Sequence, residues 1–155
     1  MTRFIITVAL LMLGASIAPA EDVAFHRTQV VDARNHATQA DLIFSSSTRS
    51  ISVRVADRVL AQVPYTSIDK MSYEFSKHHR IKEGAIVMVA SLGAGGVVML
   101  TQSKSHWLYV DYKENGIPKT LVLRMHKKDY KKILMTAREQ TGKDVLFAKD
   151  AKLKL

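Results

Sequence analysis

Four basic side chains flank the longest uncharged stretch of this sequence, and their chemistry is the easiest to assign. Residues 84–103 carry no charged side chain, and the four bases lie just outside them: Lys77, Arg80 and Lys82 on one side and Lys104 on the other. If the stretch folds back on itself, its ends meet and the bases form a collar. Each Lys or Arg close to an anionic membrane contributes about 1 kcal/mol, so the collar would contribute on the order of 3 kcal/mol once the adjacent acid is discounted. The collar therefore predicts reversible binding to an anionic surface or partner.

The uncharged stretch itself is apolar on both sides of a Gly-Ala-Gly-Gly break at residues 93–96. It could be a buried hairpin of the fold, a hairpin whose tip dips into a bilayer, or a spanning helix. Interior glycines cost about 1 kcal/mol each in an aqueous helix, but the loss is smaller in lipid, so composition leaves all three open. In the second of these alternatives, the hairpin that dips into a bilayer, the membrane tip is formed by Leu92, Val97 and Val98.

The N-terminus has the pattern of a secretory signal peptide over residues 1–20. Arg3 is followed by an apolar run from Phe4 to Leu13, and Ala18-Pro19-Ala20 places small residues where a signal peptidase cuts. The apolar run is shorter than the roughly 20 residues of a spanning helix. We therefore expect cleavage after Ala20 and export to the periplasm or cell envelope.

The charge and the absence of cysteine limit the class of protein. The whole chain of 155 residues has a net charge of +9, and loss of residues 1–20 removes one base and no acid, which leaves 135 residues and +8. A basic exported domain favours anionic partners, either a membrane surface or an envelope protein. Export argues against nucleic acid. The lack of cysteine excludes a lipid-anchored lipoprotein and a thiolate zinc site.

Catalytic and metal-binding patterns are absent from the sequence. There is no Gly-x-Ser-x-Gly nucleophile elbow, no Gly-Lys-Ser/Thr phosphate loop, and no pair of carboxylates except Glu21-Asp22. His78 and His79 are adjacent and would face opposite sides of a strand. We therefore expect a binding protein rather than an enzyme, with no metal and no cofactor.

The hydrophobic pattern predicts a mainly β fold with one helix. Residues 21–39 are polar and read as an N-terminal arm with a possible strand at 24–31. From residue 40 the period is two, which predicts half-buried antiparallel strands, and Asn115-Gly116 predicts a hairpin. The period changes near Lys128–Thr141, where one apolar stripe predicts an amphipathic helix that ends before Gly142. The domain would span residues 40–148, followed by a basic tail at 149–155.

Three segments then resemble a known family. They are Val-Pro-Tyr-Thr-Ser-Ile at 63–68, Ser-His-Trp-Leu-Tyr-Val at 105–110, and the stretch from Lys128-Asp129-Tyr130 through Ile133-Leu134 to Thr141-Gly142-Lys143. Together they look like bacterial exported pleckstrin-homology-like (PH-like, GRAM-like) domains over residues 42–145. The chain departs from that pattern at Val63 and in its glycine-rich insert. The resemblance implies a partly open antiparallel barrel of about seven strands, capped by the C-terminal helix, and it implies binding rather than catalysis.

Overall fold

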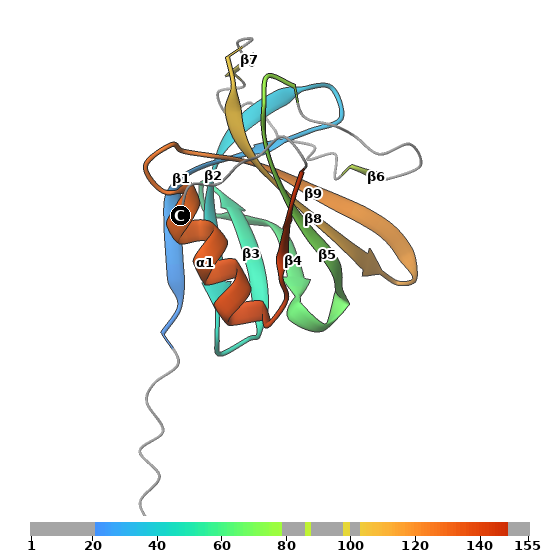
Figure 1. The fold of residues 1–155 in the computed structure, drawn as a ribbon. Coiled ribbons are helices and arrows are strands. Elements are labelled where there is room, and N and C mark those ends of the chain that lie inside the picture. The colour runs from blue at the N-terminus through green and yellow to red at the C-terminus, as the bar shows by residue number, and fades with distance from the viewer. Residues whose placement is uncertain (1–20, 79–85, 88–97, 100–102, 149–155) are drawn as a thin grey trace, which may run out of the picture.

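The computed structural model describes residues 21–78, 86–87, 98–99 and 103–148 (Figure 1). The signal peptide predicted at 1–20 and the basic tail predicted at 149–155 lie outside the described residues. The expectation of a mainly β fold with one helix is confirmed. The elements are β1 (Val23–Val31), β2 (His36–Ser45), β3 (Ser50–Val55), β4 (Arg58–Pro64), η1 (Tyr65–Ser67), β5 (Ile68–Ser76), β6 (Ile86–Val87), β7 (Val98–Met99), β8 (Ser105–Glu114), β9 (Ile117–Met125), α1 (Tyr130–Thr141) and β10 (Val145–Phe147).

Ten strands of the described residues belong to one sheet. Its main path runs β10-β5-β8-β9-β1-β2-β3-β4, while β6 pairs with β9 and β7 pairs with β2 beside that path. Two antiparallel runs, β1 to β4 and β5-β8-β9, are joined where β1 pairs with β9. Figure 1 shows that the strands curve and that α1 lies in front of them.

The hairpin between β8 and β9 has the predicted turn. Asn115 and Gly116 both have positive φ, 53° and 78°, which is the conformation that a two-residue type I′ turn requires. The turn fixes the register from Glu114 opposite Ile117 to His106 opposite Met125. This pairing brings Lys104 and the end of β9 to the same end of the sheet.

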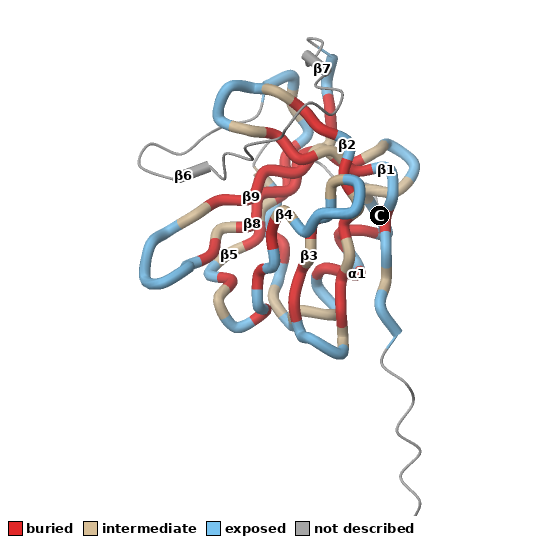
Figure 2. The backbone as a smooth tube through the Cα atoms, turned by 180° about the vertical axis from the view of Figure 1, so that it is seen from behind, coloured by how far each residue is buried: buried red, intermediate tan, exposed pale blue. Residues whose placement is uncertain are grey.

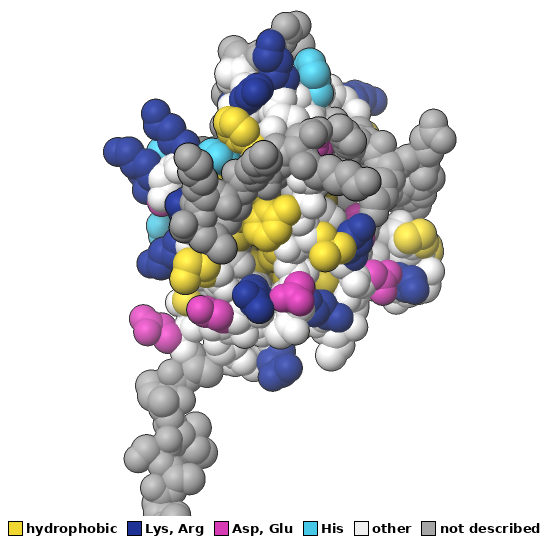
Figure 3. All heavy atoms as spheres, viewed as in Figure 1, with side chains coloured by type: hydrophobic (Ala, Val, Ile, Leu, Met, Phe, Trp, Pro, Cys, Tyr) yellow, Lys and Arg dark blue, Asp and Glu magenta, His cyan; other side chains and the backbone are white. Residues whose placement is uncertain are grey.

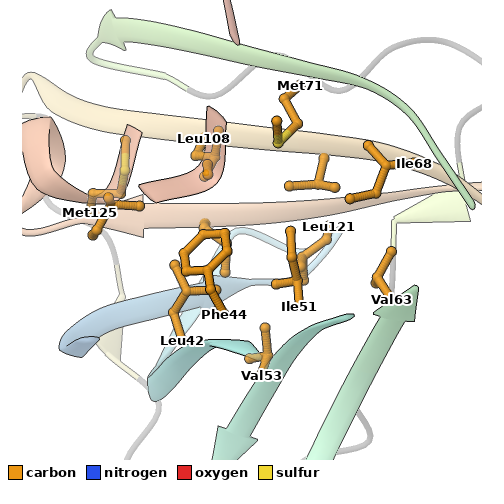
Figure 4. Close-up of a cluster of buried hydrophobic side chains, with 14 of the residues drawn as sticks. Leu42, Phe44, Ile51, Val53, Val63, Ile68, Met71, Leu108, Leu121 and Met125 are labelled. Carbon is orange, nitrogen blue, oxygen red and sulfur yellow. The ribbon is translucent and has the colours of Figure 1, made fainter. Parts of the chain in front are cut away.

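The main core fills the space enclosed by the curved strands. Buried residues lie along β1 to β5, β8 and β9, and Figure 2 shows them in red. In Figure 4 side chains from different strands point toward one another, among them Leu42, Phe44, Ile51, Met71 and Leu121. Burial of such side chains contributes about 1.5–3 kcal/mol each before conformational entropy is subtracted. The fold thus rests on packing between the two runs of strands.

Helix α1 closes this core with the stripe that the sequence predicted. Ile133, Leu134 and Ala137 are buried in the main cluster, whereas Met135 on the other side of the helix is 60% exposed. The helix ends where Gly142 takes a left-handed conformation with φ of 68°, and the Gly142 N–H donates to the Arg138 carbonyl. A residue without a Cβ adopts this conformation without strain, which is why the pattern located the end correctly.

A smaller cluster lies on the opposite face of the sheet. Trp107 and Tyr109 of β8 pack there with Val122 of β9 and with Val31 and Ala37 of the β1–β2 hairpin. Tyr109 pairs with Val122, while the neighbouring pair of Leu108 and Leu123 belongs to the main core. Because successive side chains of a strand alternate between faces, the sheet is apolar on both faces in this region.

Two sequence predictions are wrong. Residues 21–39 are not an arm, because β1 lies inside the sheet between β9 and β2. The strand named at 24–31 corresponds to β1, and only its place inside the sheet was missed, because the β1–β2 register shifts between Phe25 and Thr28 and a bulge there breaks the period of two. The sheet is also not wholly antiparallel, and it has more than seven strands. Helix α1 reverses the chain after β9, so β10 runs parallel to β5, and β6 is parallel to β9.

Candidate anion-binding site

The structure brings two of the four predicted collar residues to one place. The β5–β8 ladder ends at Ser76 opposite Ser105; Lys77 follows the first of these residues, Lys104 precedes the second, and both are exposed. The ammonium of Lys104 lies 5.9 Å from the centre of the Phe75 ring, within the range of a cation–π contact. Arg80 and Lys82 lie outside the described residues.

One residue of the predicted membrane tip can be placed. Val98 belongs to β7, and its backbone pairs with Ala37 at the start of β2. β3 pairs with β2 only over Asp41–Ser45, which leaves the backbone of His36 and Ala37 open to this second strand. Leu92 and Val97 lie outside the described residues.

Sequence reasoning missed a hollow of about 550 Å³ that begins beside Lys104. It is bounded by β1, β2, β5, β8, β9 and the loop after β9, and four cationic side chains line it: Arg27, Lys104, Arg124 and Lys127. No Asp or Glu among the described residues lines it. In Figure 3, Lys and Arg side chains gather over the loop that joins β9 to α1. We call this site the basic hollow.

Sheet register explains why the wall of the basic hollow is polar. Gln39 pairs with Gln29 across β2 and β1, and Gln29 pairs with Arg124 across β1 and β9. Paired residues of adjacent strands point to the same face, so these three side chains form one row. These three residues are distant in sequence. The one sequence feature that pointed to this row is Arg124, a charged residue in a strand with Leu121, Leu123 and Met125.

Arg124 is the one half-buried cation of the basic hollow, whereas Arg27, Lys104 and Lys127 are exposed. Its Nε donates to the Ser105 hydroxyl at 2.9 Å and its Nη1 donates to the Gln29 amide oxygen at 3.3 Å. Both acceptors are neutral, and within the described parts of the chain no carboxylate forms an ion pair with this guanidinium. Partial burial lowers the pKa of Arg124 from its usual value, because water no longer solvates the charge fully. An anion in the hollow would supply the missing charge.

Arg27, by contrast, already has a partner. Its Nη2 donates to an Asp129 carboxylate oxygen at 2.7 Å. The other Asp129 oxygen lies 4.0 Å from Nδ1 of His126, which also lines the hollow. Asp129 therefore ties the start of α1 to β1 at the mouth of the basic hollow.

A stack of rings forms the wall next to Lys104. His106 lies between Phe75 and Tyr130, with ring centroids 4.7 Å and 3.8 Å apart, and the Tyr73 hydroxyl lies 2.8 Å from His106 Nδ1. Burial lowers the pKa of His106. Burial, followed by Tyr130, raises the pKa of Tyr73 to about 12. At neutral pH both groups are therefore uncharged, and the imidazole tautomer sets which of the Tyr73 hydroxyl and His106 Nδ1 donates the proton of this hydrogen bond.

The cationic and amide side chains that line the basic hollow can bind an anion. Among the described residues no three His, Asp or Glu side chains come together to hold a metal ion. Within the same residues, no helix is long and apolar enough to cross a membrane. No protein-family model matches the sequence, and no curated protein is similar to it. The function must therefore be argued from the basic hollow itself.

Proposed function

We propose that this protein is a non-enzymatic, exported binding module that associates with an anionic surface or partner of the cell envelope. The observation that carries the proposal is the basic hollow, whose described lining holds four cationic side chains and no acid. Such a surface attracts anions, because concave walls of one charge sign concentrate the field.

Electrostatics supports reversible attachment. Lys77, Lys104 and Lys127 are all exposed at the same end of the sheet. At about 1 kcal/mol for each base near an anionic membrane, they would contribute roughly 3 kcal/mol. That energy is screened by salt, because the Debye length is about 10 Å at 0.1 M.

We also propose the PH-like fold that the sequence resemblance implies. It is supported by the two antiparallel runs, by their junction between β1 and β9, and by the helix whose apolar stripe enters the core. In this proposal the signal peptide at 1–20 is removed, and the mature protein begins at Glu21. Asp22 then holds the first residues to the β2–β3 turn, where it accepts hydrogen bonds from the Ser45 hydroxyl and the Ser46 N–H.

One observation favours a second candidate, a periplasmic module that binds another protein and makes no lipid contact. Both described pieces of the uncharged stretch pair with the sheet, β6 with β9 and β7 with β2. This pairing ties the stretch to the domain at two points. It supports an insert that packs on the domain rather than one that enters a bilayer.

Flotation with lipid vesicles separates the two candidates. The mature protein should float with vesicles that contain phosphatidylglycerol and not with phosphatidylcholine alone, and added salt should weaken the binding. The test variant is Lys104→Glu/Lys127→Glu. Its control is Arg54→Glu/Arg58→Glu, which changes the net charge equally on exposed positions of β3 and β4.

The results of flotation distinguish attachment through the basic hollow, a general effect of net charge, and the absence of lipid binding. Loss of flotation in the first variant alone supports the basic hollow as the attachment site. Equal loss in both variants would show that only net charge matters. If the unmodified protein does not float with any anionic vesicle, lipid binding is wrong and the protein-binding candidate remains.

A further inference from the structure

The net positive charge of the basic hollow favours anions that carry more than one negative charge. Arg27 is neutralised by Asp129, so the remaining cations of the described lining are Lys104, Arg124 and Lys127. A carboxylate or a phosphodiester carries one negative charge and would leave most of this charge uncompensated. A phosphate monoester carries about −1.5 to −2 at pH 7 and matches it better.

Arg124 also has the geometry for a phosphate. Ser105 and Gln29 hold the guanidinium through Nε and Nη1, which fixes the plane of the fork. The Nη2 donors make no hydrogen bond within the described residues. A fixed guanidinium fork that still has donors suits an oxyanion with several oxygens.

The rest of the wall suits a hydroxylated group attached to the phosphate. A volume of about 550 Å³ lies in the range of about 300–1,000 Å³ that is typical of small-molecule sites, and a bare phosphate would fill only a small part of it. The Gln39 amide nitrogen donates to the His26 carbonyl, which leaves its oxygen as an acceptor. The Gln29 oxygen accepts from Arg124, which leaves its nitrogen as a donor. Hydroxyl groups, which both donate and accept, satisfy this pair.

We infer that the basic hollow binds a phosphate monoester on a hydroxylated carrier, with Arg124 as its central contact and Lys104 and Lys127 at the rim. The inference rests on the proposed function and narrows its anionic partner to one chemical class. The carrier can be a lipid headgroup or a soluble sugar phosphate, and the experiment distinguishes these sources.

Isothermal titration calorimetry of the mature protein with four soluble probes tests the chemistry. Glucose 6-phosphate should bind at least about tenfold more tightly than gluconate or dimethyl phosphate, and glucose should not bind. Arg124→Gln should weaken glucose 6-phosphate binding about tenfold or more, as expected for loss of charge-assisted hydrogen bonds. Lys127→Gln should weaken it less, and Arg58→Gln, on β4 outside the hollow, should not change it.

A second experiment with lipid vesicles shows whether the carrier is a lipid headgroup or a soluble sugar phosphate. Vesicles that contain lipid A, whose phosphate monoesters are attached to a hydroxylated sugar, and vesicles of phosphatidylglycerol are matched in surface potential. Preference for lipid A that depends on Arg124 indicates a lipid carrier, even if glucose 6-phosphate does not bind. Binding of glucose 6-phosphate without that preference indicates a soluble carrier.

Two results would overturn the inference. Equal affinity for monoester, diester and carboxylate would show that the hollow does not select a dianion. Unchanged binding by Arg124→Gln and Lys127→Gln, with melting temperatures near that of the unmodified protein, would place binding elsewhere. If anionic vesicles still bind in either case, the inference fails while the proposed function stands. If neither vesicles nor soluble phosphates bind, both fail.

Discussion

Replacement of Ile133 by alanine tests whether α1 seals the core. Ile133 is fully buried and belongs to the cluster that includes Leu42 and Leu121. Removal of a buried isoleucine side chain costs about 2–5 kcal/mol, because apolar contacts are lost and a cavity is left. Since domains of this size are stable by about 5–15 kcal/mol, Ile133→Ala should lose a large fraction of the folding free energy without unfolding.

The same helix offers a matched control. Met135 is 60% exposed, so Met135→Ala should change stability by less than about 0.5 kcal/mol, as surface substitutions usually do. Both variants replace a large apolar residue with alanine, and only burial differs. Leu134→Asp should prevent folding, because its carboxylate would be placed in the core without a partner.

Urea denaturation of the mature proteins measures these effects. Circular dichroism reports the strands and helix, while fluorescence reports Trp107, the only tryptophan, which is 2% exposed in the second cluster. A loss of about 3 kcal/mol should also lower the melting temperature by roughly 10 °C. Equal stability of Ile133→Ala and Met135→Ala would refute the claim that α1 closes the core.

Further predictions concern the turn, pH and export. Gly116→Ala should cost about 1 kcal/mol in urea denaturation, because its φ of 78° strains any Cβ although nothing lies within 4 Å of one. Stability should fall as pH drops below about 6.5. The pKa of His106 is lowered in the folded protein, so below this pH the unfolded chain binds a proton that the folded protein does not bind. His106→Phe should flatten this decline. Stability should also fall between about pH 10 and 12, because the pKa values of Tyr65 and Tyr73 are raised to about 12. Mass spectrometry of the exported protein should find Glu21 at its N-terminus, and an N-terminus at Met1 would contradict export with cleavage.

Local pattern was a good guide where each strand kept its period. The alternation beyond residue 40 correctly predicted strands, and it is visible in β3, where Ile51 and Val53 are buried, and in β5, where Met71 and Tyr73 are buried. The Asn115-Gly116 turn and the Gly142 helix end were also predictable, because positive φ restricts residue type. These features depend on neighbours along the chain, so sequence alone is sufficient for them.

Interruption of the period hid the place of β1 in the sheet. The register shift after Phe25 moves buried positions out of alternation, so the strand named at 24–31 was assigned to a polar arm rather than to the middle of the sheet. The parallel pairing of β10 with β5 was equally invisible, since it depends on how α1 crosses the core.

The mainly β character, the amphipathic helix and the excess of positive charge follow from the sequence alone. The place where that charge gathers depends on the tertiary structure. Gln29, Gln39, Ser105 and Arg124 meet only because β2, β1, β9 and β8 are neighbours in the sheet. Side-chain period is a property of a single strand, whereas a binding site is a property of strand order, and strand order is set by packing between residues that are distant in the chain.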